Sequence, residues 1–139
     1  MQLRLMTAED HSDMLKLWRS CRGIGIYDID DSREGIARFL KRNPSSCFVA
    51  EDEGEIVGTV MAGHDGRRGY IYHTAVAPHR RKEGIGTLLV TKALQILKEE
   101  GITVAALVVF SDNEAGNAFW EKMGFVTRDE VKYRNIHLK

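Results

Sequence analysis

A short stretch rich in glycine and positive charge, residues 76–87, constrains this chain more than any other part of it. Residues 70–75 before it have the composition of a strand, and apolar residues after it recur at the spacing of one helix face. A strand therefore passes into a helix through this loop. The first amides of a helix are unpaired and lie at the positive end of its dipole, and glycines let a ligand approach the backbone closely. The stretch predicts a site for a phosphate-bearing ligand.

The spacing within this loop differs from two other phosphate-binding loops. It has neither the Gly-Lys-Ser/Thr of a Walker loop nor the three glycines of the dinucleotide fingerprint. It reads Val76-x-Pro78, then Arg81-x-x-Gly84-x-Gly86. Between a strand and an amphipathic helix, this order resembles the acetyl-coenzyme A (acetyl-CoA) signature of the GNAT superfamily of N-acetyltransferases. Taken without their context, the Arg-x-x-Gly-x-Gly residues are also compatible with an ordinary loop at a helix start.

A second motif lies in residues 113–125, Asn-Glu-Ala-Gly-Asn-Ala-Phe-Trp-Glu-Lys-Met-Gly-Phe. It is similar to the family's Asn-x-x-Ala-x-x-Phe-Tyr-x-Lys-x-Gly-Phe helix. Asn113 can cap this helix and reach a ligand, while Phe119, Trp120 and Met123 supply apolar packing. Taken alone, the segment also fits a plain amphipathic core helix. With both motifs in the family's order, the resemblance covers most of the chain.

Length and composition narrow the class of protein. The 139 residues fit a single domain, 1–139, and can bury a core without disulfides or metal. The formal net charge of +0 gives no reason to expect nucleic acid or a membrane as a partner. We expect a cytoplasmic protein, because there is neither a signal peptide nor an apolar run of membrane-spanning length. Cys21 and Cys47 are expected as reduced thiols, and the five histidines show no metal-ligand spacing, so no metal is expected.

The order of elements is α/β (α+β). The central helix of residues 84–100 should bury Leu88, Leu89, Ala93, Ile96 and Leu97, and Gly101 should end it. The family resemblance implies a mixed, twisted sheet of six to seven strands with about four helices. It also implies a V-shaped split between the fourth and fifth strands, residues 70–77 and 103–110. The other strands are expected near 2–6, 47–51, 55–63, 125–128 and 131–138, and the other helices near 8–22, 32–43 and 113–123. The continuous apolar run 103–110 predicts a strand covered on both faces.

The resemblance also implies how acetyl-CoA would bind in the split. Its pyrophosphate would rest on the loop amides, and its pantetheine arm would pair with the fourth strand beside a β-bulge. The backbone N–H of Val76 would hold the thioester carbonyl as an oxyanion donor. Acetyl would pass directly to an amine, with no acyl-enzyme. The cofactor-binding residues would be Thr74, Ala75, Val76, Ala77, Arg81, Lys82, Glu83, Gly84, Ile85, Gly86, Thr87, Asn113 and Trp120.

Two catalytic positions depart from the family's pattern. Trp120 stands where many members have a tyrosine that serves the leaving thiolate, and Val108 stands where some have a glutamate base. Tyr72, with Tyr70 on the same face, is the candidate for lining the amine slot and relaying a proton. By strand alternation His73 should point the other way. The alternative is that the two tyrosines only pack on the sheet. Tyr133 is the candidate to replace the missing tyrosine hydroxyl.

The acceptor site would involve the connection between the first two helices. Tyr27, Asp28, Asp30 and Asp31 lie there, and carboxylates would attract a cationic amine such as a polyamine, an amino acid, an antibiotic or a protein N-terminus. A solvated acidic loop is the alternative. Two other functions stay open, a non-catalytic acetyl-CoA-binding sensor or interaction module and a plain nucleotide-phosphate binder. Dimers are common in the family, so the resemblance is compatible with a homodimer, although the residues themselves do not indicate an oligomeric state.

Overall fold

A computed structural model describes residues 1–138. The chain forms two compact units, Met1–Val108 and a smaller one that begins at Val109, and each is described by itself. Within the described residues, every helix is too short or too polar to span a lipid bilayer.

The first unit is built on a mixed sheet with the order β1-β2-β3-β4-β5. Neighbours from β1 to β4 are antiparallel, whereas β4 and β5 are parallel and pair only at Gly69↔Ala105 and Tyr70↔Ala106. This arrangement confirms the fold class. Beyond these two residue pairs β4 and β5 no longer pair, and this is the region in which the family resemblance implied a split between the two strands. The strands are β1 (Gln2–Leu5), β2 (Phe48–Asp52), β3 (Glu55–His64), β4 (Gly69–Val76) and β5 (Ala105–Ala106).

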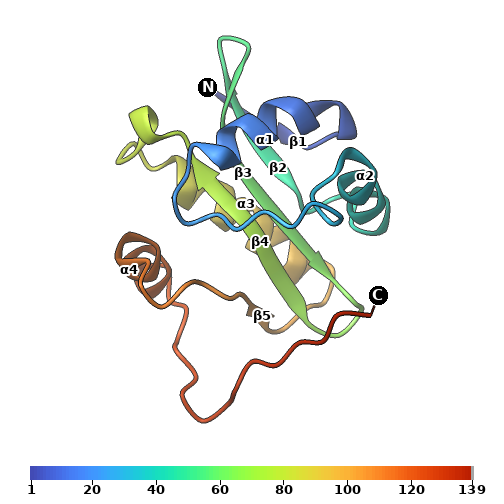
Figure 1. Cartoon of the computed structure of the whole chain (residues 1–139), viewed down its shortest axis with the longest axis vertical. Coiled ribbons are helices and arrows are strands. Elements are labelled where there is room, and N and C mark those ends of the chain that lie inside the picture. The colour runs from blue at the N-terminus through green and yellow to red at the C-terminus, as the bar shows by residue number, and fades with distance from the viewer. Residues whose placement is uncertain (139) are drawn as a thin grey trace. The chain divides into compact units, whose positions relative to one another are not determined.

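Helices cover both faces of the sheet. Figure 1 shows α1 and α2 on one face and α3 on the other. The glycines of β3 agree with this: a Cβ on Gly58 would meet Leu89 of α3, and one on Gly63 would meet Phe39 of α2. The α-helices are α1 (His11–Arg19), α2 (Arg33–Arg42), α3 (Ile85–Glu99) and, in the second unit, α4 (Glu114–Lys122); short 3-10 turns are η1 (Ala8–Asp10) and η2 (Pro78–Arg80).

The buried face of α3 is shifted from the expected one. Leu88 is 49% exposed, although the sequence analysis placed it in the core. The helix instead begins its buried stripe at Ile85 and continues through Leu89 and Ala93 to Leu97, a spacing of four that excludes Leu88. Gly101, with a φ of +86°, follows the helix as predicted.

The strands expected after α3 are shorter or absent. Only Ala105–Ala106 of the run 103–110 is a strand, and Val104 and Val108 are about half exposed, so this run is not covered on both faces. The pair expected at 125–128 and 131–138 is wrong, since residues 125–138 contain no strand. A segment forms a strand only where the edge of a neighbouring strand can pair with it, and β5 is only two residues long.

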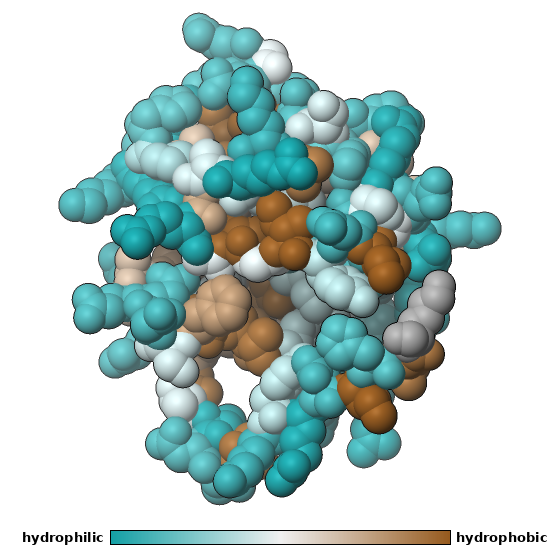
Figure 2. Space-filling model, in the orientation of Figure 1, coloured by the Kyte–Doolittle hydropathy of each residue, from teal (hydrophilic) through white to brown (hydrophobic). Residues whose placement is uncertain are grey.

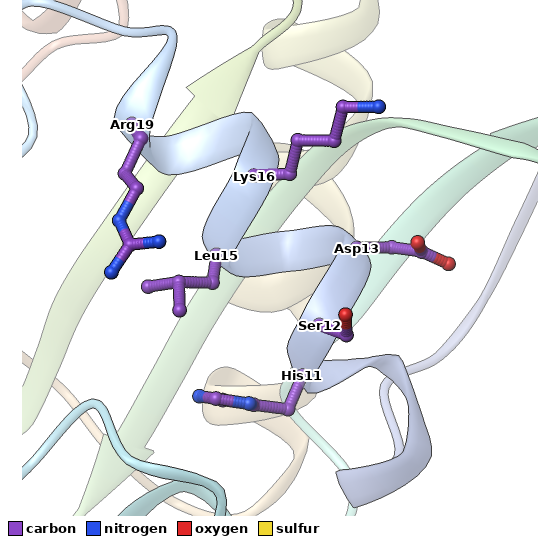
Figure 3. Close-up of a pocket in the computed structure, with 6 residues that line it drawn as sticks. All are labelled: His11, Ser12, Asp13, Leu15, Lys16 and Arg19. Carbon is purple, nitrogen blue, oxygen red and sulfur yellow. The ribbon is translucent and has the colours of Figure 1, made fainter.

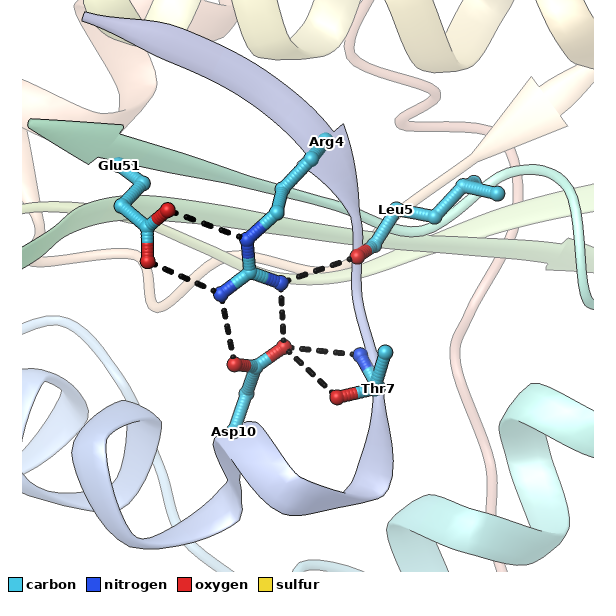
Figure 4. Close-up of polar contacts among 5 residues, drawn as sticks. All are labelled: Arg4, Leu5, Thr7, Asp10 and Glu51. Carbon is cyan, nitrogen blue, oxygen red and sulfur yellow. Dashed lines mark hydrogen bonds and ion pairs between the residues drawn. The ribbon is translucent and has the colours of Figure 1, made fainter. Parts of the chain in front are cut away.

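Arg4 ties the first strand to the start of α1 and to β2 (Figure 4). Its guanidinium donates to both carboxylate oxygens of Asp10, each at 2.9 Å, and to Glu51 at 3.2 Å. Asp10 also accepts from the backbone N–H of Thr7 at 2.8 Å. Burial alone would raise the pKa of Asp10, but the hydrogen bonds from Arg4 and Thr7 outweigh it and hold that pKa below its ordinary value.

We predict that Asp10→Asn lowers the free energy of unfolding at pH 7 by about 1.5–3 kcal/mol, because charge-assisted hydrogen bonds are lost. A depressed pKa stabilises the fold above the unfolded-state pKa of Asp10, and that stability disappears as pH falls through the folded-state pKa. Urea unfolding at pH 7 and pH 3 should therefore show a difference from wild type that shrinks in acid. Asp13→Asn, at an exposed acid in the first turn of α1, is the control. A difference that does not depend on pH would contradict this account.

Candidate active site

The loop after β4 presents unpaired backbone donors. Lys82 and Gly84 both have positive φ, +66° and +83°, so the chain turns sharply twice before α3 begins. The first helical bond is donated by Leu88 to the carbonyl of Gly84 at 3.0 Å. The amides of Ile85, Gly86 and Thr87 therefore have no helical acceptor, and they lie at the positive end of the α3 dipole.

Gly84 is needed for a reason that the sequence did not reveal. A Cβ at this position would have no protein atom within 4 Å, so crowding does not explain the glycine. Its φ of +83° does, because side chains disfavour the left-handed region. Lys82 takes up a similar φ without being glycine, a strain of about 1–3 kcal/mol that such loops store at functional sites.

The three cations of the loop have different partners. Arg80 is held by Asp52 at 2.9 Å and by Glu83 at 3.1 Å, which ties the loop to the β2–β3 turn. The hydrogen bonds to Asp52 and Glu83 raise the pKa of the Arg80 guanidinium. The hydrogen bond that Asp52 accepts from Arg80 lowers the pKa of the Asp52 carboxyl. Arg81 donates from Nε to the carbonyl of Val76 at 3.3 Å. Lys82 is exposed and forms no ion pair among residues 1–138.

The end of β4 leaves a backbone donor on its open edge. The N–H of Ala77 donates to Val57 of β3 at 2.8 Å. Because successive amides of a strand point to opposite edges, the N–H of Val76 points away from β3. On that side β4 has no ladder partner beyond Tyr70 in the first unit.

A β-bulge interrupts β4 just before this edge. Thr59 pairs with Ala75 and Met61 pairs with Tyr72, so two residues of β4, His73 and Thr74, oppose a single residue of β3. The resemblance implied a bulge in this strand, and the structure contains one.

A buried hydrogen-bond chain holds the bulge in place. The indole N–H of Trp18 donates to the hydroxyl of Thr59 at 3.0 Å, and this hydroxyl donates to the carbonyl of His73 at 2.9 Å. Trp18 and Thr59 are both fully buried.

The expected orientation of His73 is wrong. Its ring lies 4.6 Å from that of Trp18 on α1, on the same face where Tyr72 packs against Phe39 of α2. The bulge inserts one residue and so cancels the alternation that the sequence argument used. His73 is the residue that the sequence analysis missed, and a bulge leaves no local signal at this position.

The acidic connection 27–31 is an ordered turn. The N–H of Asp31 donates to the carbonyl of Tyr27 at 2.8 Å, and the Asp31 carboxylate accepts from the N–H of Tyr27 at 2.9 Å. Asp31 is buried, whereas Asp28 and Asp30 are exposed.

Apolar surface lies next to these carboxylates. Tyr72 is 47% exposed and its ring lies 4.6 Å from that of Tyr70; Tyr27 and Ile29 are 44% and 54% exposed. Figure 2 shows hydrophobic surface where this connection crosses β4. Tyr72 packs against Phe39 of α2, and Figure 1 shows the connection between α1 and α2, which carries Tyr27, Asp28 and Asp30, on that same face of the sheet.

The remaining predicted residues lie in the second unit. Asn113 caps α4 as expected, and its side chain accepts from the N–H of Gly116 at 2.9 Å. Trp120 packs edge-on against Phe119 and Phe125, with ring centroids 4.9 and 5.1 Å apart. Tyr133 is 67% exposed and its hydroxyl lies 3.5 Å from the amide nitrogen of Asn135.

Other features of the described residues do not form a reaction centre. A shallow hollow along α1 is lined by side chains of that helix alone, and Figure 3 shows them diverging (His11, Ser12, Asp13, Leu15, Lys16, Arg19). Within residues 1–138 no group of His, Cys, Asp or Glu could hold a metal ion. Cys21 and Cys47 are buried and not bonded to each other, and burial raises the pKa of Cys47 to about 12.

Comparison with known proteins decides the family. Residues 11–125 match the acetyltransferase (GNAT) family. The chain belongs to the GNAT acetyltransferase family. As a GNAT acetyltransferase, it uses acetyl-CoA as its acetyl donor.

Curated relatives agree with this assignment. An acetyltransferase of Pectobacterium atrosepticum is 34% identical over 129 residues, which cover 93% of this chain and 90% of that protein. An acetyltransferase of Sodalis glossinidius is 32% identical over 131 residues, 94% of this chain and 91% of that protein.

Solved structures show the same fold at lower identity. The PaiA N-acetyltransferase of Thermoplasma acidophilum, in complex with coenzyme A, has a TM-score of 0.79 at 20% identity and covers 93% of this chain and 92% of its own. A predicted acetyltransferase of Clostridium acetobutylicum, with acetyl-CoA, has a TM-score of 0.74 at 20% identity. The match covers 96% of this chain and 95% of that one.

We predict that Thr59→Val destabilises this GNAT acetyltransferase by about 1–3 kcal/mol for each group left unpaired, the Trp18 indole and the His73 carbonyl. Urea unfolding measures the loss. Thr103→Val, at an exposed threonine, is the matched control, because it makes the same chemical change without breaking a buried bond. An equal effect of the two substitutions would show that the buried chain does not hold the bulge.

We also predict that Gly84→Ala weakens acetyl-CoA binding about tenfold, since forcing a side chain into the left-handed region costs about 1–2 kcal/mol and favours other loop conformations. Gly66→Ala is the control, because Gly66 has a similar φ of +89° and equally open surroundings in the turn before β4. Both variants should lose similar stability, but only Gly84→Ala should show a smaller rise in Tm than wild type on adding acetyl-CoA. An equal rise in both would contradict the role given to this loop.

Proposed function

We propose that this GNAT acetyltransferase moves acetyl from acetyl-CoA directly to a primary amine of a small molecule or of a protein N-terminus. One observation carries the proposal: the open edge of the bulged β4 runs straight into a loop of unpaired amides at the start of α3. An extended thioester arm fits the strand edge, and a diphosphate fits the loop.

The diphosphate would be bound by main-chain donors more than by side chains. The amides from Lys82 to Thr87 surround the helix start, and Lys82 adds a cation that is not engaged elsewhere among the described residues. Arg80 is already neutralised by two carboxylates, so its part is to fix the loop. The residues that we assign to this end of acetyl-CoA are Arg81, Lys82, Glu83, Gly84, Ile85, Gly86 and Thr87.

The acetyl end would lie along the last residues of β4. Thr74, Ala75, Val76 and Ala77 would line the pantetheine arm, and the outward N–H of Val76 would donate to the thioester carbonyl. A donor aimed at this oxygen stabilises the tetrahedral intermediate that forms when an amine attacks, and one such donor is typically worth about a hundredfold or more in kcat. From the motif in the second unit we retain Asn113 and Trp120 as cofactor contacts and Tyr133 as proton donor to the thiolate.

The acceptor would approach the face that carries α1 and α2. Asp28 and Asp30 are exposed at the tip of an ordered turn, so their charges have no close cationic partner in the first unit and can attract an ammonium group. Tyr27, Tyr70 and Tyr72 would pack against the carbon chain that bears it. We therefore propose a cationic acceptor with an aliphatic or sugar body.

The test is turnover with a panel of amines. The purified protein with acetyl-CoA is given spermidine, lysine, kanamycin or a short peptide with a free N-terminus, and free thiol and N-acetyl product are measured. We expect turnover with at least one of them. Binding of acetyl-CoA without turnover on any amine would instead favour a non-catalytic module, and equal stabilisation by ATP would favour a general nucleotide-phosphate binder.

We predict that the double change Asp28→Asn and Asp30→Asn raises KM for the cationic amine about twofold to fivefold per charge and leaves kcat unchanged, as befits exposed charges. The effect should fade at high salt. Glu34→Gln, an exposed acid on α2, is the control and should leave KM unchanged. If KM changes equally in both variants, the acidic turn is not part of the acceptor site.

A further inference from the structure

A buried histidine–carboxylate pair lies beside the proposed acceptor site. We propose that His73 takes the proton from the attacking amine and that Asp31 positions its ring. The inference rests on the proposed transfer to an amine and supplies the base that Val108 cannot.

The pair is close and largely shielded from water. Nε2 of His73 lies 2.9 Å from Oδ2 of Asp31, and the two side chains are 15% and 9% exposed. The ring N–H is not aligned on this oxygen as in a regular hydrogen bond, and Nε2 is otherwise buried without a partner in residues 1–138. The attraction is therefore mainly electrostatic as the two groups stand.

The carboxylate decides which ring nitrogen can act as a base. A neutral imidazole carries one proton, and Asp31 favours its placement on Nε2. The lone pair then lies on Nδ1. Among the described residues Nδ1 has no hydrogen-bond partner, and the side chain retains some exposed surface. Nδ1 is the nitrogen left to accept a proton from outside.

Both members of the pair are held in place by buried or ordered groups. The edge of Trp18 packs on the His73 ring with an interplanar angle of 64°, and the Thr59 hydroxyl fixes the His73 carbonyl. Asp31 is fixed by the N–H of Tyr27, and its carbonyl contacts Nε2 of His11 at 2.7 Å. Such second contacts lower the cost of orienting a catalytic group at the moment of reaction.

The position of His73 along β4 suits this task. It precedes Val76 by three residues, which corresponds to about 10 Å of extended strand. At this separation the proton of an amine attacking a carbonyl held at Val76 would pass to His73 through bridging waters. The ammonium first gives a proton to Nδ1; the neutral nitrogen then bonds to the carbonyl carbon, the C–S bond breaks, and coenzyme A leaves as the thiol with a proton from Tyr133, which is restored by the proton that nitrogen loses. His73 returns its proton to water.

The first measurement needs no acceptor. The groups that face His73 are Asp31 from the 27–31 turn, Trp18 from α1 and Tyr72 beside it on β4, with His11 behind Asp31. In long-range ¹H–¹⁵N spectra of the full chain, with His73 assigned by the signal missing in His73→Gln, we expect the Nε2–H tautomer and loss of that preference in Asp31→Asn. A wild-type Nδ1–H tautomer would overturn the proposal.

The second measurement is kinetic, with whichever panel amine turns over. His73→Gln should lower kcat/KM about a hundredfold or more and remove the acid limb of its pH profile, while acetyl-CoA still raises Tm. Asp31→Asn should cause a smaller loss, because it removes only the group that positions the ring. A normal pH profile in His73→Gln would overturn the proposal even if kcat fell, because a structural role would not involve the proton.

His64→Gln is the matched control. His64 also pairs with a carboxylate, Nε2 to Oε1 of Glu100 at 2.8 Å, but at the far end of β3. Its loss should leave the pH profile unchanged. Failure of the proposed function would appear differently, as wild-type binding of acetyl-CoA without turnover of any amine, and the tautomer spectrum would still decide the state of His73.

Discussion

The extra residue in β4 is the constraint on which the proposed site depends. Placing His73 and Thr74 opposite one residue of β3 ends the regular ladder and turns His73 toward α1. The irregularity leaves a backbone carbonyl to be satisfied, and a fully buried threonine hydroxyl, itself bonded to Trp18, does so. The bulge thus determines the face that the imidazole occupies, and the open strand edge follows from the early end of the pairing between β4 and β5.

Beyond the bulge, the proposed binding of the donor would depend on main-chain geometry, with the charges of the loop secondary. Two residues with positive φ, Lys82 and Gly84, aim the first amides of α3 at a common region. Arg80 is the most firmly bound cation of the loop, yet its partners Asp52 and Glu83 show that it serves the fold. A chain with no net charge can therefore bind a highly anionic cofactor, because the donors are local.

Features with local causes could be predicted from the sequence. Gly101 follows α3 in the left-handed region and Asn113 caps α4, both as expected from the residues themselves. The loop between β4 and α3 was likewise placed correctly. Each of these signals lies within a few residues of the feature that it specifies.

Features with distant causes could not be predicted. The face of His73 depends on a register shift against β3, and its partner Asp31 is 42 residues away in the sequence. Strands were expected after Gly124, but a segment becomes a strand only if another strand has an unpaired edge beside it. The sequence does not show where such an edge lies. The sequence does not distinguish Arg80 from its neighbours Arg81 and Lys82. Only the position of Asp52 in the fold shows that Arg80 forms a structural ion pair.

The most direct test of the central claim is to map acetyl-CoA binding by amide chemical shifts in ¹H–¹⁵N spectra. The account predicts that titration shifts the amides of residues 82–87 and 74–77 most strongly, with Val76 among them. Saturation without shifts at these amides, or shifts centred on the hollow along α1, would contradict it.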